Sequence, residues 1–307
     1  MWQRCYSKND ALSILVIGGF TNDLIGSGVL RVGGPAYYIA TTLMQLDEAP
    51  AVITNSYKLL DVVNHAFMCN KVYAPKSDGV FVFEIIESNG SRKLRLARRG
   101  PSINNLVEEL ISKWADSSTK FDVAIVSPVF NEVSSEVVAK LGGIADYIVV
   151  DIQGFVRKCS DRYCTVIVDE RRFYDLVNVL AGSVNVIRGE LHEFPEECRG
   201  LKISKCVAGL VDVVQTSGPG NMYVYLSKLG KTIKLRPLPG IEGSNIGAGD
   251  VFTGVLAYFM GRGMDLLSSC ARASVAAGLR VGRPGKLWFT LSELEALSHK
   301  ILRHINS

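Results

Sequence analysis

The chain has 307 residues, of which 48% are hydrophobic and 21% charged, a composition typical of a soluble globular protein with ample material for a core. Lys and Arg outnumber Asp and Glu by 34 to 30, an excess too small to indicate a nucleic-acid partner. No apolar segment reaches the roughly 20 residues that a membrane-spanning helix needs, so we expect no membrane partner either.

The cysteines argue against a zinc site. There are seven of them, at positions 5, 69, 159, 164, 198, 206 and 270, and no Cys-x-x-Cys occurs. The N-terminus also lacks the long apolar run of a signal peptide. We therefore expect a cytoplasmic protein with reduced thiols.

The first half of the chain predicts buried strands and a helix. Short apolar runs predict strands at Ile14–Gly18 and Ala51–Thr54. Between them, Ala36–Leu46 has the length of a helix, and Pro35 suits its first turn.

A β-hairpin is predicted next. Gly79–Glu87 and the stretch that ends at Ala97 both alternate apolar with polar residues, and Asn89-Gly90 between them is a strong hairpin signal. Because the hairpin is polar on one face, we interpret residues 79–98 as most of a small β lid. Residues 24–32 are expected to add a third strand to this lid, which is inserted into one domain spanning 1–307.

From residue 121 onward, apolar strands alternate with helices, which predicts a doubly wound, mostly parallel α/β sheet flanked by helices. The expected strands are Val123–Ser127, Tyr147–Asp151, Ser183–Ile187 and Val211–Thr216, followed by an edge hairpin of Tyr223–Leu226 and Thr232–Leu235. The expected helices are Ser134–Gly142, Glu170–Leu180, Leu191–Arg199, Asp250–Gly261, Leu266–Val281 and Thr290–Ile305.

In such sheets, ligands bind beyond the carboxyl ends of the strands. Five polar residues end or follow predicted strands and should meet at this edge: Asp23, Asp151, Glu190, Glu193 and Thr216.

The most informative segment is the turn that opens the predicted helix at Asp250. Three small residues, Gly247, Ala248 and Gly249, precede this aspartate, so the first N–H groups of the helix can face an anion. A carboxylate beside an anion site would repel the anion, but it could orient or deprotonate a nucleophile that attacks it. The pattern therefore favours phosphoryl transfer, with a helix-capping aspartate as the alternative.

This turn resembles the second signature of the ribokinase-like (PfkB) carbohydrate kinases. Further segments that resemble the family occur in the expected order: Val16–Asp23, Val32–Ala36, Asp151–Arg157, Val214–Gly218 and Arg283–Gly285. The sequence of Asp151–Arg157 is similar to that of the myo-inositol kinase branch. The resemblance implies a ribokinase-like fold and an ATP- and Mg²⁺-dependent kinase that phosphorylates a hydroxyl of a small sugar or polyol.

The resemblance also implies roles for individual residues. Asp250 would be the catalytic base, with Gly247, Ala248 and Gly249 as N–H donors to the transferred phosphoryl group. The substrate would contact Asp23, Gly33, Gly34, Gln153 and Arg157. The nucleotide would contact Thr216, Gly218, Ala277 and Gly285. Glu193, with Glu190, would hold Mg²⁺. Because a helix N-terminus favours an ionised carboxylate, we expect Asp250 to be a weak base.

Two departures from the family pattern leave alternatives open. Glu190 stands where the family has Asn, so it could strengthen metal binding or simply begin a helix. Ser244 replaces an Asp that some members use in a monovalent-cation site, which makes activation by K⁺ doubtful. Arg157 could hold a phosphate or pair with Asp151, and the glycines at 33 and 34 could form a plain turn. A ribokinase, fructokinase or nucleoside kinase, a non-catalytic nucleotide-binding regulator, and a homodimer formed through the lid all remain open.

Overall fold

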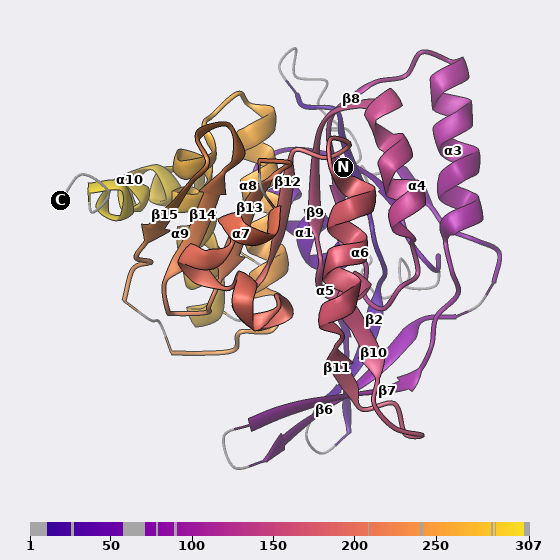
Figure 1. The fold of residues 1–307 in the computed structure, drawn as a ribbon. Coiled ribbons are helices and arrows are strands. Elements are labelled where there is room, and N and C mark those ends of the chain that lie inside the picture. Colours follow the sequence, from indigo (N-terminus) through magenta and orange to yellow (C-terminus); the bar gives the residue numbers. More distant parts are fainter. Residues whose placement is uncertain are drawn as a thin grey trace, which may run out of the picture.

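The computed structural model describes residues 11–25, 28–57, 71–77, 79–88, 91–207, 209–239, 242–283, 285 and 287–303. These residues form the predicted α/β fold, with a large, mostly parallel sheet flanked by helices and a separate small sheet (Figure 1). None of the helices in these ranges is both long and apolar enough to span a bilayer. Of the residues singled out above, Cys5, Cys69, Asn89, Gly90, Pro284 and the last two of the predicted helix Thr290–Ile305 lie outside the described residues.

The large sheet has nine strands in the order β15-β14-β13-β12-β9-β8-β1-β4-β5. Their bounds are β1 Ile14–Ile17, β4 Ala51–Ile53, β5 Lys71–Tyr73, β8 Phe121–Val126, β9 Ala145–Asp151, β12 Val186–Glu190, β13 Asp212–Thr216, β14 Met222–Leu226 and β15 Lys231–Leu235. All neighbours from β5 to β13 pair in parallel, whereas β14 and β15 continue the sheet antiparallel. Strand β1 is buried along its whole length, as expected of a parallel strand covered on both faces.

Helices cover both faces of this sheet (Figure 1). One face carries α1 Pro35–Gln45, α8 Ala248–Gly261, α9 Leu266–Gly282 and α10 Leu291–Leu302. The other carries α3 Asn104–Asp116, α4 Ser135–Ala139 and α6 Glu170–Leu180, with the short α5 Gln153–Val156 and α7 Ser204–Val207 nearby. Consecutive residues of β1 belong to the hydrophobic cores on opposite faces of the sheet: Val16 packs with α8, and Leu15 packs with α3.

The small sheet has the strand order β3-β2-β6-β7. Its strands are β2 Thr21–Ile25, β3 Val29–Gly33, β6 Phe81–Ser88 and β7 Ser91–Arg98, so the predicted hairpin is present as β6 and β7. A further hairpin, β10 Arg157–Cys159 and β11 Val166–Val168, bridges to β7 through Arg95 and Thr165. In Figure 1, β6, β7, β10 and β11 lie together at the lower end of the molecule.

The start of the small sheet corrects two predictions. The expected single strand 24–32 is instead two antiparallel strands, β2 and β3, and Gly28 before β3 adopts a positive φ of 91° that suits a chain reversal. Residues 26 and 27 lie outside the described residues. Asp23 was expected at the carboxyl end of β1, but it lies inside β2.

Two predictions between residues 183 and 199 are also wrong. The expected helix Leu191–Arg199 consists of separate 3₁₀ turns at Leu191–Glu193 and Glu196–Cys198. Pro195 explains the break, because it holds Phe194 in an extended conformation with ψ of 150°. The strand expected at Ser183–Ile187 begins later, at Val186, so Arg188 and Glu190 belong to the strand.

The expectation of reduced thiols is contradicted. Cys159 pairs with Cys164 across the β10–β11 hairpin, and Cys198, at the end of a 3₁₀ turn, pairs with Cys206 in α7. The backbone brings each pair close, with Cα atoms 4.4 and 5.8 Å apart. Cys270 is a buried free thiol in α9.

Candidate active site

Two cavities meet at the N-terminus of α8. The first, of about 740 Å³, lies between the two sheets, and we call it the Asp23 cavity. The second, of about 710 Å³, lies beside α8, α9 and the end of β13, and we call it the Thr216 cavity. Four residues line both cavities: Arg188, Glu190, Asn245 and Gly249.

The turn before α8 is shaped by its glycines. Gly247 has a positive φ of 79°, and a side chain there would begin 2.5 Å from the ring of Tyr38. The Ala248 N–H donates to the Asn245 carbonyl at 3.1 Å, so this one of the three predicted anion donors is already used. Gly249 lies where both cavities meet, and α8 cannot satisfy the N–H groups of its own first turn.

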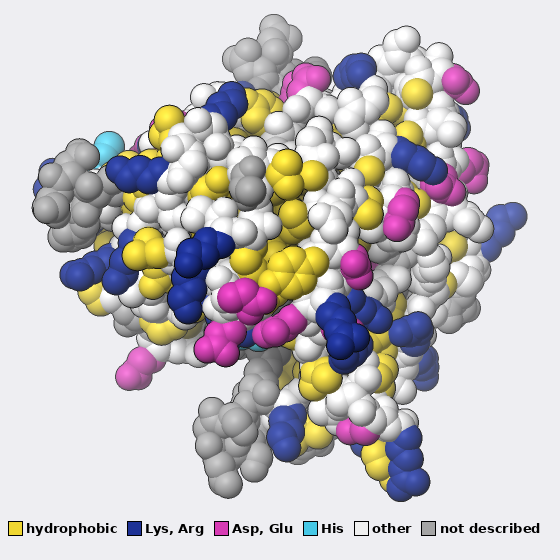
Figure 2. Space-filling model, in the orientation of Figure 1, with side chains coloured by type: hydrophobic (Ala, Val, Ile, Leu, Met, Phe, Trp, Pro, Cys, Tyr) yellow, Lys and Arg dark blue, Asp and Glu magenta, His cyan; other side chains and the backbone are white. Residues whose placement is uncertain are grey.

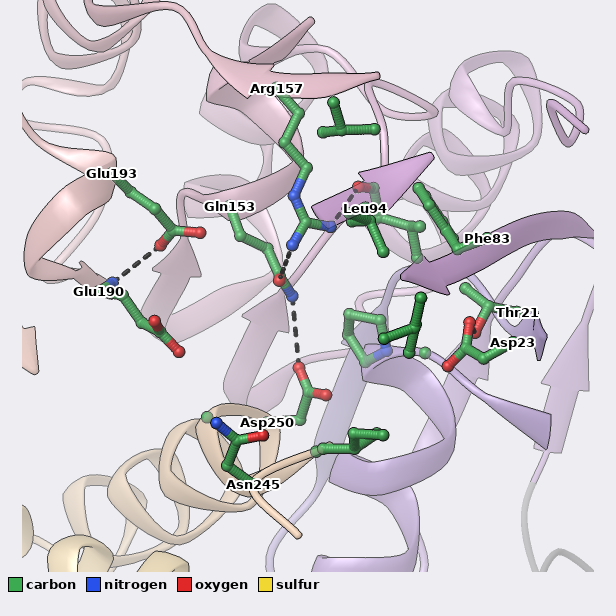
Figure 3. Close-up of a pocket in the computed structure, with 18 of the residues that line it drawn as sticks. Thr21, Asp23, Phe83, Leu94, Gln153, Arg157, Glu190, Glu193, Asn245 and Asp250 are labelled. Atoms are coloured by element: carbon green, nitrogen blue, oxygen red, sulfur yellow. Dashed lines mark hydrogen bonds between the residues drawn. The ribbon is translucent and has the colours of Figure 1, made fainter. Parts of the chain in front are cut away.

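Asp250 opens into the Asp23 cavity and stands in a chain of polar contacts (Figure 3). Gln153 Nε2 donates to Asp250 Oδ1 at 3.4 Å, and Arg157 Nη2 donates to Gln153 Oε1 at 2.9 Å. Arg157 Nη1 donates to the carbonyl of Val129 at 3.0 Å, so Arg157 does not pair with Asp151. The structure thus brings three of the predicted site residues together, from α5, β10 and α8.

The charge state of Asp250 differs from the expectation. Burial, followed by the neighbouring charge of Asp151, raises the pKa of Asp250 from 3.8 to about 7, although Arg188 and Arg157 act in the opposite direction. The helix terminus therefore does not make this carboxylate a weak base. A carboxylate with a pKa near neutrality can accept a proton efficiently.

Asp23 lies across the same cavity from Asp250 (Figure 3). Thr21 Oγ1 donates to Asp23 Oδ1 at 2.9 Å. A side chain at Gly33 would begin 2.5 Å from Asp23 Oδ2, and one at Gly34, which has a φ of 89°, would begin 2.5 Å from the Gly19 carbonyl. Both glycines are therefore required by close packing, and Gly34 also lines the cavity.

A buried ion pair that the sequence did not indicate joins the two cavities. Arg188 Nη1 donates to Asp151 Oδ2 at 2.7 Å, and Nη2 donates to Thr216 Oγ1 at 2.8 Å. Asp151 is fully buried and also accepts from Thr253 Oγ1 at 3.0 Å. Burial opposes the charge of Arg188, yet the carboxylates around it, Asp151 first, keep its pKa above the ordinary value.

The two glutamates lie at the rim of the Asp23 cavity (Figure 3). Glu193 is buried and accepts the Glu190 N–H at 2.8 Å, whereas the Glu190 side chain is 49% exposed and lies 3.4 Å from His192 Nδ1. Burial, then the charge of Asp151, raises the pKa of Glu193 to about 8. No cluster of three or more His, Cys, Asp or Glu side chains suited to a metal occurs in the described ranges.

The Thr216 cavity contains three of the four predicted nucleotide-binding residues. Thr216, Gly218 and Ala277 line it, together with apolar side chains from α8, α9 and the loop after β15. Gly285 is not among the residues that line this cavity, and its carbonyl instead accepts the Trp288 Nε1–H at 2.7 Å.

Comparison with known proteins agrees with this fold. Residues 157–287 match the model of the pfkB family carbohydrate kinase. The comparison with curated proteins found no match. Among solved structures, a pyrophosphate-dependent kinase of the ribokinase family, complexed with a pyrophosphate analog and myo-inositol, has a TM-score of 0.72 at 16% identity, covering 92% of this chain and 99% of that one.

Two further solved structures are similar over nearly their whole length. Phosphofructokinase-2 from Escherichia coli, in complex with potassium, has a TM-score of 0.65 at 13% identity, covering 95% of this chain and 100% of that one. A nucleoside kinase from Burkholderia thailandensis, in complex with inosine, has a TM-score of 0.65 at 15% identity, covering 94% and 97%.

The fold is therefore that of the ribokinase-like kinases. In addition, residues 157–287 match the pfkB family of carbohydrate kinases, which are phosphotransferases with a hydroxyl group as acceptor.

Proposed function

We propose that the protein transfers the γ-phosphoryl group of ATP to a hydroxyl of a small sugar or polyol, with Asp250 as catalytic base. One observation carries this proposal: Asp250 stands at the N-terminus of α8, where a cavity with a polar floor meets a second cavity with apolar walls. We assign the acceptor to the Asp23 cavity and the nucleotide to the Thr216 cavity.

In the proposed reaction, the acceptor hydroxyl lies between Asp23 and Asp250. Asp250 takes its proton as the acceptor oxygen attacks the γ-phosphorus, and Gln153 and Arg157 hold the carboxylate in place. The N–H groups of Gly247 and Gly249, at the positive end of α8, support the charge on the transferred group. Thr216, Gly218 and Ala277 bind the nucleotide.

Mg²⁺ fits the rim between the cavities. Glu190 lines both of them and presents an accessible carboxylate, with Glu193 three residues further on. Mg²⁺ in kinases keeps several waters and is held by one or two carboxylates and the donor phosphates. Because the pKa of Glu193 is near 8, binding of the cation would have to displace a proton from it at neutral pH.

The walls of the Thr216 cavity favour a nucleotide over pyrophosphate as donor. Phe252, Met222, Leu238, Val275 and Leu279 supply an apolar lining that suits a flat base. The cavity is lined by one cationic side chain among the described residues, that of Arg188. Pyrophosphate would have no use for the apolar part of this cavity.

The walls of the Asp23 cavity narrow the choice of acceptor. Asp23, Gln153 and Arg157 are suited to hydroxyl groups, and this arrangement makes myo-inositol our first choice. Apolar side chains also line this cavity, among them Phe83, Ile85, Leu94, Val129 and Val166. These apolar side chains also suit a planar base, so a nucleoside is the second candidate.

The test is a screen for ADP release with Mg-ATP against myo-inositol, ribose, fructose, 2-keto-3-deoxygluconate, adenosine, cytidine and inosine. A parallel series replaces ATP with pyrophosphate and follows release of phosphate. We expect one acceptor to support turnover with ATP, and Asp250→Asn to abolish it. Clear ATP binding with no turnover of any acceptor would favour the non-catalytic regulator.

We further propose that the small sheet is the lid of a single kinase domain and that it forms a homodimer contact. Its edge strand β3 exposes Val29 and Leu30, which are 52% and 56% accessible. Light scattering should give a dimer for the wild type and a monomer for the double variant Val29→Asp/Leu30→Asp. A monomeric wild type would contradict this proposal.

On the face drawn in Figure 2, Lys and Arg side chains lie in several separate places among Asp and Glu, in keeping with a small-molecule partner.

A further inference from the structure

We propose that Arg188 is a further catalytic residue, which contacts the transferred phosphoryl group where the two cavities meet. The inference rests on the proposed kinase function and assigns a role to a side chain that the sequence did not indicate. Three independent features of its position carry it: its place between the cavities, its unused donors and its contact with α8.

Arg188 is the guanidinium that both ligands would share. It extends from the middle of β12 and lines the Asp23 cavity and the Thr216 cavity alike. A phosphoryl group that passes from a donor in one cavity to an acceptor in the other must cross the region that these shared residues line. A cation in this position neutralises charge on the group in transit.

The side chain is buried but not fully used. Arg188 is 4% exposed, and its ion pair with Asp151 and its bond to Thr216 use two of its five N–H groups. Its Nε is buried without a hydrogen-bond partner among the described residues. Burial of an ion pair costs desolvation free energy, and an apolar pair of similar volume often stabilises a fold equally well. Unused donors on a buried cation are explained if an anionic ligand completes their coordination.

The backbone around Arg188 keeps its charged end against the helix. A side chain at Gly249 would begin 3.0 Å from Arg188 Nη1 and 3.1 Å from Nη2, so the guanidinium lies close against the first turn of α8 and would have to shift for any larger residue there. Nη1 also donates to Asp151, and the ring of Phe252 lies 5.5 Å from Cζ. The guanidinium and the positive end of α8 thus act on the same point in space.

In the transfer step, the acceptor oxygen forms a bond to the γ-phosphorus, and its proton goes to Asp250. The bond between the γ-phosphorus and the bridging oxygen breaks, and ADP leaves with that electron pair. Arg188 donates N–H groups to the γ-phosphoryl oxygens throughout and neither gains nor loses a proton. Its contact is with the γ-phosphoryl group, so it should distinguish ATP from ADP.

This distinction gives a test that needs no knowledge of the acceptor. Calorimetric titration would compare the Mg²⁺ complexes of ADP and of the non-hydrolysable β,γ-imido analogue of ATP, on wild type and Arg188→Met. We expect the variant to lose roughly 10- to 100-fold in affinity for the analogue and less than threefold for ADP, as for loss of a charge-assisted hydrogen bond. Arg199→Met is the matched control, because Arg199 lies outside both cavities and binds the Phe194 carbonyl.

Each outcome decides between the alternatives. Equal losses for both nucleotides, or no loss for either, would show that Arg188 is only structural and would overturn the inference. If Arg188→Met does not fold, Arg188→Lys keeps the charge without the planar fork, and it should still lose affinity for the analogue more than for ADP. A wild type that binds neither nucleotide would instead refute the proposed donor, and the inference with it.

Discussion

Asp250→Asn should make the protein more stable while it removes activity. The pKa of Asp250 is higher in the folded protein than in the unfolded chain, so the folded state binds this proton more tightly. Ionisation of Asp250 therefore costs stability. The loss develops as the pH rises from 3.8 to about 7 and is complete above that range. Asn cannot ionise, so the variant escapes the loss.

The size of the effect follows from the two pKa values. A rise from 3.8 to about 7 corresponds to about 4 kcal/mol, at about 1.4 kcal/mol per pH unit. The Asp250 side chain is only half-buried and opens into the cavity, so solvent screening reduces the effect to about 1–2 kcal/mol. We expect Asp250→Asn to exceed the wild type by this amount in free energy of unfolding at pH 8.

Urea unfolding of both proteins at pH 4.5, 6 and 8, without ligands, tests the reasoning. The gap should be largest at pH 8 and shrink steadily toward pH 4.5. Asp116→Asn is the control, because it removes an exposed carboxylate from the end of α3. A gap that does not change with pH, or a variant less stable than the wild type at pH 8, would refute the argument that Asp250 is destabilised by burial.

Three further predictions concern activity. With Asp250 as the base, kcat/KM should fall about tenfold for each pH unit below about 7 and level off above it. A flat profile from pH 5 to 8 would show that the ionisation of Asp250 does not limit the rate. Gly249→Ala should displace the neighbouring guanidinium of Arg188 and cut kcat at least tenfold. The control Gly142→Ala, at a glycine with open space around it, should leave kcat unchanged. Equal rates for the two variants in steady-state assays would contradict the close contact between Gly249 and Arg188. Reduction of the Cys159–Cys164 disulfide should raise KM for the acceptor severalfold and leave KM for ATP unchanged, because residues 165–168 beside it line the Asp23 cavity. Both constants would be measured with and without dithiothreitol. A matching change in both would rule out a local effect of the disulfide.

The parallel sheet could be predicted from the sequence because its signals are local. Short apolar runs such as Val123–Ser127 are found as buried strands, and Glu170–Leu180 is a helix with the predicted bounds. The amphipathic α3, which begins at Asn104, was missed although its apolar residues recur at helical spacing. The helix predicted at Leu191–Arg199 failed because Pro195 was given too little weight.

The site was less predictable, because its geometry depends on strand pairing. The resemblance to a kinase family singled out Asp250, Gln153 and Arg157, and the structure places them in contact. Arg188 was missed because its partner is set by register: β9 and β12 pair so that Arg188 lies beside Asp151. A weak signal was available, since a charged residue inside the apolar run Val186–Arg188 must find a partner when buried.

Asp23 shows why a correct motif can still be misplaced. The residue was predicted at the end of β1, where ligands of parallel sheets bind, yet the chain has already entered the small sheet at Thr21. The switch depends on the pairing of β2 with β6, which lies some 60 residues further along the chain. No local pattern encodes a contact of that range.

If the Asp23 cavity binds the acceptor as proposed, its walls, which come from both sheets, would also limit the hydrolysis of ATP by water. Water could reach Asp250 as readily as a sugar hydroxyl could, and a base with a pKa near 7 would activate either one. Phe83 and Leu94 of the small sheet face this carboxylate across the cavity, so an acceptor bound between them would fill the space that an attacking water needs. The rate of ATP hydrolysis without an acceptor would then report how well the small sheet excludes water from Asp250. Polar replacements of Phe83 and Leu94 should increase this rate.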